Sequence, residues 1–162
     1  MQNAVLRRPG NEKSRVPNFL YIDEFPDFIC KATEPIFTMY RKYKVGTVIS
    51  AQNLEQLNVS GAKQTILSNC ASKIFTGGGV IGELEWWSSE FGQKREWAMS
   101  NTIDFDKGKY DPKHSGVKWD FTPYFKPGKL QTLSQKECAF KIRGSNGKPI
   151  VGPGKVNYLE SK

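Results

Sequence analysis

Apolar runs of strand length alternate with longer segments of helical spacing over the first ninety or so residues. The first run, NFLYID at 18–23, is almost continuously apolar, which is typical of a strand covered on both faces in a parallel sheet. Two more apolar runs follow it, at 45–50 and 73–75. In other segments apolar residues recur every three or four positions, which predicts helices. These helices are expected at 31–44, 61–70 and 82–92.

The order of these elements predicts an α/β fold with a mostly parallel sheet, right-handed crossovers and helices on both faces. From 93 to 129 the alternation of strand-like and helix-like segments becomes less regular. REWAMSNTIDF alternates like an edge strand, and the rest of this region is expected to be a long loop or insertion. Toward the end, ECAFKIRG and KPIVGPGKVNYL predict two strands joined by the turn SNG. Residues 1–17 are polar and rich in turn residues, so we expect a tail or connection there.

The composition is that of a soluble globular protein, with 38% hydrophobic and 25% charged residues in a chain of 162. No apolar run approaches the ~20 residues that a membrane-spanning helix needs, and the first residues lack the apolar centre of a signal peptide. We therefore expect a cytoplasmic location. The three cysteines are widely spaced, and the single histidine, His114, lies in the loop-like stretch DPKHSG. Neither a disulfide framework nor a histidine-based site is expected.

The formal net charge of +8 is compatible with binding to nucleic acid, an anionic membrane or a nucleotide. The basic residues are scattered, however, and no block of five like charges occurs. KYDPKHSGVK and YFKPGK are basic stretches of the second half. For these stretches a solvated surface is favoured over a nucleic-acid interface.

Carboxylates follow the first apolar run directly, as Asp23 and Glu24. Ligands of open parallel sheets bind beyond the carboxyl ends of the strands, so these two side chains either turn into solvent or form part of a site. Gln52 comes just after the second run, and Thr76 with several glycines comes after the third. If the three strands are neighbours, these groups converge on one edge. Carboxylate oxygens are the ligands that a hard cation such as Mg²⁺ prefers.

An apolar strand that ends in Asp-Glu resembles the Walker B element of P-loop ATPases. The resemblance implies that Asp23 holds Mg²⁺, usually through water, and that Glu24 polarises the attacking water. A glutamine at the end of the next strand resembles the γ-phosphate sensor of the RecA-like branch, so Gln52 takes that role. These side chains suit the chemistry, because phosphoryl transfer depends on a cation and a positioned water.

The resemblance extends to a series of segments over about 18–152. They are LYIDEFPDF, YRKYKVGTVISAQNLEQL, ILSNCASKIFTGGG, SSEFGQK and LQTLSQKECAFKIRGSNGKPI. In order and spacing they resemble the second half of TraG/VirD-type conjugative coupling proteins, the ATPases of type IV secretion systems. This resemblance implies a three-layer RecA-like P-loop NTPase fold, of which residues 18–162 form the C-terminal half. The SSEFG segment favours a coupling protein over the channel-energising ATPase of the same system.

The family resemblance also implies a set of partners and a location. Coupling proteins form rings, commonly hexamers, that use ATP and Mg²⁺ to move DNA with its bound relaxase or relaxosome proteins toward the secretion channel. They lie at the cytoplasmic face of the bacterial inner membrane. A cation from the neighbouring subunit usually completes each ATP site. Arg41 is the first candidate for this arginine finger, and Lys42 and Arg95 are alternatives. A surface or helix-end role is the competing interpretation for Arg41.

One element of the family is missing, namely the phosphate loop GxxxxGK[ST]. Gly77 and Gly82 have the right spacing, but Glu83 stands where the lysine belongs. We therefore expect this chain to be inactive as an ATPase by itself. It would be a piece of a longer protein, the product of a split gene or a remnant. The main alternative is a stand-alone module that binds partner proteins and hydrolyses no nucleotide.

Overall fold

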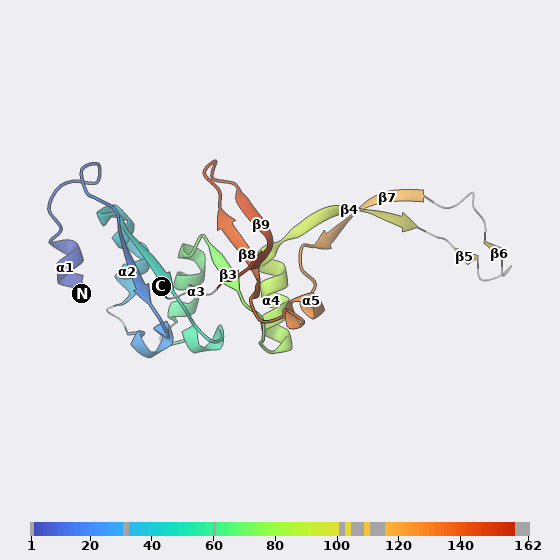
Figure 1. The fold of residues 1–162 in the computed structure, drawn as a ribbon, viewed down its shortest axis with the longest axis horizontal. Coiled ribbons are helices and arrows are strands. Elements are labelled where there is room, and N and C mark those ends of the chain that lie inside the picture. Colours follow the sequence, from blue (N-terminus) through green and yellow to red (C-terminus); the bar gives the residue numbers. More distant parts are fainter. Residues whose placement is uncertain are drawn as a thin grey trace. The chain divides into compact units, whose positions relative to one another are not determined.

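Two compact units make up the chain, and Figure 1 draws their helices and strands as a ribbon. They comprise Met1–Lys73 and Ile74–Lys162. The computed structural model describes residues 2–30, 33–59, 61–100, 103–104, 109–110 and 116–157. His114 lies outside the described residues, so its predicted surface position stays a prediction. None of the described helices is long and apolar enough to cross a membrane.

The first unit contains two strands and several short helices. The elements are α1 (Gln2–Leu6), β1 (Asn18–Ile22), η1 (Phe25–Phe28), α2 (Glu34–Thr38), η3 (Tyr40–Tyr43), β2 (Val45–Ile49), η4 (Glu55–Leu57) and α3 (Ala62–Asn69). The helix expected over 31–44 is divided into α2 and the 3₁₀ helix η3. Lys44, which ends η3, has a left-handed backbone with φ 50°, and this reverses the chain into β2.

Strands β1 and β2 pair in parallel, as expected, with Asn18 opposite Val45 and Ile22 opposite Ile49. One face of the pair packs on a core of buried Val5, Ile36 and Tyr40. The other face is exposed.

The prediction that β1 is covered on both faces is therefore wrong for this structure. Phe19 and Tyr21 are 61% and 73% exposed, and Val48 of β2 lies beside them at 48%. Because side chains alternate along a strand, the helices of this unit bury only the Leu20 and Ile22 side of β1.

The second unit combines a small sheet, a helical layer and a long hairpin. Its elements are β3 (Lys73–Phe75), α4 (Ile81–Phe91), β4 (Gln93–Ser100), β5 (Ile103–Asp104), β6 (Lys109–Tyr110), β7 (Gly116–Pro123), α5 (Pro127–Gln131), β8 (Glu137–Arg143) and β9 (Pro149–Lys155). Strand β3 pairs with β8, and β8 pairs antiparallel with β9, as expected for the two C-terminal strands.

The α/β class predicted from the sequence is confirmed, but the single mostly parallel sheet is not what the structure contains. The described strands form separate small sheets, of which only β1–β2 is shown to be parallel. β3 belongs to the sheet with β8 and is not a third neighbour of β1 and β2. Short apolar runs predict strands, but they do not specify which strand pairs with which.

Aromatic side chains of α4 form the core of the second unit. Trp87 packs against Phe75 with ring centroids 5.1 Å apart and stacks on Phe91 at 5.5 Å. Phe91 in turn meets Phe125 edge to face at 5.3 Å. The buried hydroxyl of Ser88 donates a hydrogen bond of 2.6 Å to the carbonyl oxygen of Phe125. These contacts fix α4 against the segment that precedes α5.

In the region from 93 to 129, the strand expected at the start is confirmed as β4, but the expected long loop contains a second strand, β7, which pairs with it as an antiparallel hairpin. Strands β4 and β7 pair over their full length, from Gln93 opposite Pro123 to Ser100 opposite Gly116. Trp119 and Phe121, which the sequence pattern left unassigned, lie in β7. The Tyr124 amide donates to the carbonyl oxygen of Gly92 at 3.0 Å and closes the base of the hairpin.

Two phenylalanines of η1 provide a test of the first unit's core. Phe25 is 0% exposed and meets Phe37 edge to face, whereas Phe28 is 60% exposed. We expect Phe25→Ala to lower the free energy of unfolding by about 3–5 kcal/mol, because it leaves a cavity. Phe28→Ala should have little effect. Urea denaturation of both variants, followed by circular dichroism, measures the difference, and equal shifts would contradict this packing.

Candidate functional site

A pocket of about 190 Å³ lies at the edge of the first unit where β1 and β2 end. Because the strands are parallel and Ile22 lies opposite Ile49, the residues that follow each strand meet at this edge. The pocket is lined by Asp23, Glu24, Pro26, Asp27, Ser50, Ala51, Gln52 and Gln56. The structure thus brings Asp23, Glu24 and Gln52 together around one hollow.

Ser50 connects the two chain segments of the pocket. Its hydroxyl donates to Asp23 Oδ1 and accepts a hydrogen bond of 3.1 Å from the Glu24 amide. Its backbone contributes as well, because the Ser50 amide donates to the Ile22 carbonyl at 3.1 Å and the Ser50 carbonyl accepts from the Phe25 amide at 3.0 Å. The turn after β1 is therefore fixed to the end of β2 by four hydrogen bonds, two from the side chain and two from the backbone.

Glu24 has a left-handed backbone, with φ 47° and ψ 46°. Residues other than glycine, asparagine and aspartate rarely adopt this conformation, which costs on the order of 1 kcal/mol. The next residue, Phe25, is fully buried, whereas Asp23 and Glu24 are exposed. The reversal at Glu24 thus keeps two adjacent carboxylates at the pocket while the chain returns to the core.

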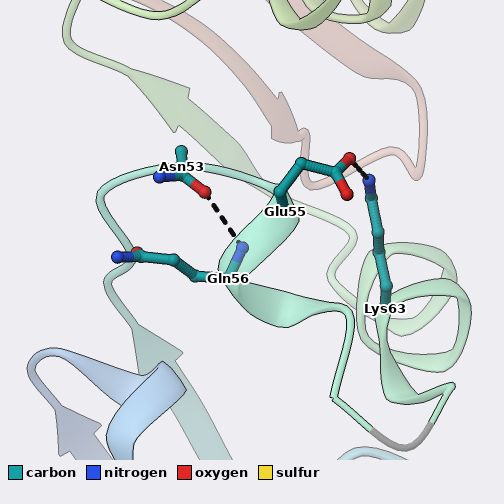
Figure 2. A network of polar contacts seen from close by, with 4 residues as sticks. All are labelled: Asn53, Glu55, Gln56 and Lys63. Carbon is teal, nitrogen blue, oxygen red and sulfur yellow. Dashed lines mark hydrogen bonds and ion pairs between the residues drawn. The ribbon is translucent and has the colours of Figure 1, made fainter.

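The loop that carries Gln52 is held by side-chain amides. Gln56 Oε1 accepts a hydrogen bond of 3.2 Å from the backbone amide of Gln52. Asn53 Oδ1 accepts one of 2.9 Å from the backbone amide of Gln56 (Figure 2). Figure 2 also shows the ion pair between Glu55 of η4 and Lys63 of α3. These contacts fix the path of the backbone after β2, so the exposed side chain of Gln52 starts from a defined position at the pocket.

Arg41 and Lys42 lie away from this pocket. Both are in η3, which immediately precedes β2, so they are at the amino edge of the sheet, opposite the carboxyl edge that carries the pocket. Both side chains are exposed. The third candidate cation, Arg95, belongs to the second unit, where its guanidinium lies over the Phe121 ring at 5.2 Å.

The structure thus brings together only some of the site residues that the sequence predicted. Asp23, Glu24 and Gln52 share the pocket, but Arg41 does not, and Thr76 follows β3 of the other sheet. Ser50 was not among the predicted site residues. Its position at the end of the strand next to the one that leads to Asp23 and Glu24 could have indicated it.

Few side chains at the carboxyl edge of β1 and β2 can bind a cation. Within the described part of the chain, no three His, Cys, Asp or Glu side chains are grouped so that they could hold a metal. One or two carboxylates with several waters is the ligand set that Mg²⁺ commonly takes in proteins, and Asp23 beside Glu24 fits it.

Solved structures of one conjugative coupling protein resemble this fold. The structure described as "Bacterial conjugative coupling protein TrwBdeltaN70. Unbound monoclinic form" has a TM-score of 0.73 and 18% identity, and covers 96% of this chain. A structure of plasmid coupling protein TrwB in complex with ADP and Mg²⁺ has a TM-score of 0.71 and 18% identity over 98% of this chain. This chain spans 34% of the length of each. At 18% sequence identity, this structural similarity is evidence for a shared fold alone.

No significant match to a curated protein was found. The model of one protein family matches residues 17–135, which is most of the chain and includes the whole pocket. This match confirms the resemblance to TraG-like coupling proteins that the sequence segments indicated. The chain belongs to the family described as the TraM recognition site of TraD and TraG.

Proposed function

We propose that this chain forms the Walker B and sensor part of the ATPase motor of a conjugative coupling protein. The observation that carries this proposal is the pocket that Asp23, Glu24 and Gln52 share at the carboxyl edge of two parallel strands. Support also comes from TrwB, whose structures contain ADP with Mg²⁺ or non-hydrolysable analogues of ATP and GTP.

Four of the pocket residues have a defined role in this proposal. Asp23 binds Mg²⁺ with the help of water, and the Ser50 hydroxyl on its Oδ1 keeps the carboxylate in one orientation. The cation neutralises charge on the phosphates. Glu24 accepts a proton from, or orients, the attacking water, and the Gln52 amide contacts the γ-phosphate. An amide suits that task because it donates hydrogen bonds without adding charge.

The remaining parts of the motor come from outside these residues. A phosphate loop of the GxxxxGK[ST] type, absent from this sequence, supplies the backbone amides and the lysine that hold the nucleotide. A cation of a neighbouring subunit completes the site in a ring, which we propose to be a hexamer. The position of Arg41 at the opposite edge of the sheet from its own pocket is compatible with service to a neighbour's site.

The ring moves DNA with its relaxase or relaxosome proteins to the components of a secretion channel, at the cytoplasmic face of the inner membrane. The net charge of +8 favours contact with a polyanion. The family description, which names recognition of TraM, supports contact with a relaxosome protein.

That same description favours a second candidate function, the binding of a partner protein without nucleotide hydrolysis. Substitution of Asp23 distinguishes the two functions. If the chain acts only as a binding module, Asp23→Ala binds a relaxosome partner as strongly as the wild type, and no variant of the pocket affects DNA transfer.

The first test concerns Glu24 in a complete coupling protein, or in this chain together with a polypeptide that supplies the phosphate loop. We expect Glu24→Gln to lower kcat for ATP hydrolysis by about 10²- to 10⁴-fold, because the general base is lost. Nucleotide binding should persist, since the amide has the size of the carboxylate. Phosphate release and the binding of a fluorescent ATP analogue measure the two properties.

Asp27→Asn is the matched control for this test. Asp27 is an exposed carboxylate that lines the same pocket, so its removal changes the local charge by the same amount. Its ATPase rate should stay close to that of the wild type. A large loss in Asp27→Asn together with an active Glu24→Gln would refute the assignment of the base.

Ser50 supplies a second test, of positioning. Ser50→Ala removes the hydroxyl that contacts Asp23 and the Glu24 amide, so we expect a higher Mg²⁺ concentration for half-maximal ATPase activity. A lost hydrogen bond of about 1 kcal/mol corresponds to roughly a fivefold rise. Ser50→Thr keeps the hydroxyl and should restore the wild-type Mg²⁺ dependence. An unchanged Mg²⁺ dependence in Ser50→Ala would contradict the role.

The action of Arg41 on a neighbouring subunit can be tested by mixing variants. Rings of Arg41→Ala alone or Glu24→Gln alone should be inactive. Mixed rings contain some interfaces with a wild-type Arg41 and a wild-type Glu24, so part of the ATPase activity should return. Lys42→Ala is the control, because Lys42 is an equally exposed cation of η3. Mixtures that stay inactive would exclude Arg41 as the finger.

A further inference from the structure

The β4–β7 hairpin has two chemically different faces. Because paired residues of an antiparallel ladder lie on the same face, the register places Arg95 beside Phe121 and Trp97 beside Trp119. We call these four residues the aromatic face. The other face carries Lys94, Glu96, Asp120 and Thr122. Figure 1 shows this hairpin extending away from α4, β8 and β9.

The aromatic face is exposed and ordered by its own contacts. Trp97, Trp119 and Phe121 are 60%, 51% and 57% exposed. The Trp97 and Trp119 rings lie with centroids 3.8 Å apart, tilted by 32°, and the Arg95 guanidinium covers the Phe121 ring. Two contacting pairs, Trp97 with Trp119 and Arg95 with Phe121, thus lie next to each other on one face of the hairpin. Exposed apolar surface of this kind usually marks an interaction site.

Charge is distributed unequally between the two faces. Among the hairpin side chains that the structure describes, Arg95 is the single ionised group on the aromatic face. Glu96 lies on the other face, where Lys94 pairs with it and Thr122 donates to its Oε2 at 2.9 Å. The hydrogen bond from Lys94, and then that from Thr122, hold the pKa of Glu96 below its usual value. The strand register, in which Glu96 lies opposite Asp120, places this carboxylate on the face away from the rings.

We propose that the aromatic face binds single-stranded nucleic acid. Exposed bases stack on aromatic rings and on arginine guanidinium planes, and the phosphates favour the positive charge of Arg95 on a face whose described side chains include no carboxylate. In a duplex the base faces are already stacked, so rings on a hairpin surface gain little from it. Lys126 and Lys129, exposed in the segment that follows β7, add positive charge near the base of the hairpin.

This inference deepens the proposed function, since it names the form of DNA and the residues that contact it, and it rests on the proposal that the protein handles DNA. It does not depend on nucleotide hydrolysis. Binding is therefore measured without ATP, so that a failure of the ATPase assignment and a failure of this inference give different results.

The test uses the 162-residue chain and a fluorescein-labelled oligothymidylate of about 20 nucleotides, long enough to span a stacking platform. Fluorescence anisotropy is measured at several salt concentrations, with a duplex of equal length for comparison. We expect tighter binding to the single strand. Trp97→Ala and Trp119→Ala should each weaken it by roughly five- to a hundredfold. Trp97→Phe and Trp119→Phe, which retain a ring, should retain most of the affinity and guard against loss of folding.

Arg95→Gln and Lys94→Gln form a matched pair, because they remove one positive charge at adjacent positions on opposite faces. Arg95→Gln should weaken binding and reduce the dependence of log K on log salt by about 0.7. Lys94→Gln should change little. Equal effects of the two variants, or alanine variants of the tryptophans that bind as the wild type does, would overturn the inference. If those alanine variants instead alter self-association, the face is a protein interface and the inference fails.

Discussion

The contacts of Ser50 with the turn after β1 are the constraint on which the pocket depends. Parallel pairing aligns the ends of β1 and β2, but alignment alone does not direct the side chains that follow. The hydroxyl of Ser50 contacts Asp23 Oδ1 and the Glu24 amide, and its backbone binds residues on either side of them. One small polar residue therefore links the orientation of the Asp23 carboxylate and the backbone of Glu24 to the strand that leads to Gln52.

Much of this pocket could be predicted from the sequence, because its components are local. Asp23 and Glu24 end an apolar run, and Gln52 follows the next one. The rule that strand ends meet at one edge of a parallel sheet is sufficient to bring them together. Ser50 and the left-handed backbone of Glu24 could not be predicted in the same way, since both depend on the geometry of a turn and not on a pattern of apolar residues.

The arrangement of the sheets could be predicted less well, because strand pairing is not local. The segments containing β1, β2, β3, β8 and β9 were expected at nearly the observed positions, yet β3 pairs with β8 and not with β1 or β2. The second strand of the hairpin was missed for a related reason. Trp97 lies in a segment that was expected to be a strand, but Trp119 belonged to no expected element, and only the pairing of β4 with β7 places the two rings together.

The left-handed backbone of Glu24 makes the turn less stable at the position for which we propose a role in the pocket. Glycine or asparagine adopts this conformation at lower cost, so either residue would relax the turn while removing the carboxylate. Random substitutions selected only for resistance to heat would therefore tend to replace Glu24. A lineage that retains glutamate there accepts a less stable turn, as is common where strain and function coincide. If Glu24 has the role proposed for it, comparison of residue 24 across related chains would separate those that retain the carboxylate at this strained position from those that replace it with a residue the turn accommodates more easily.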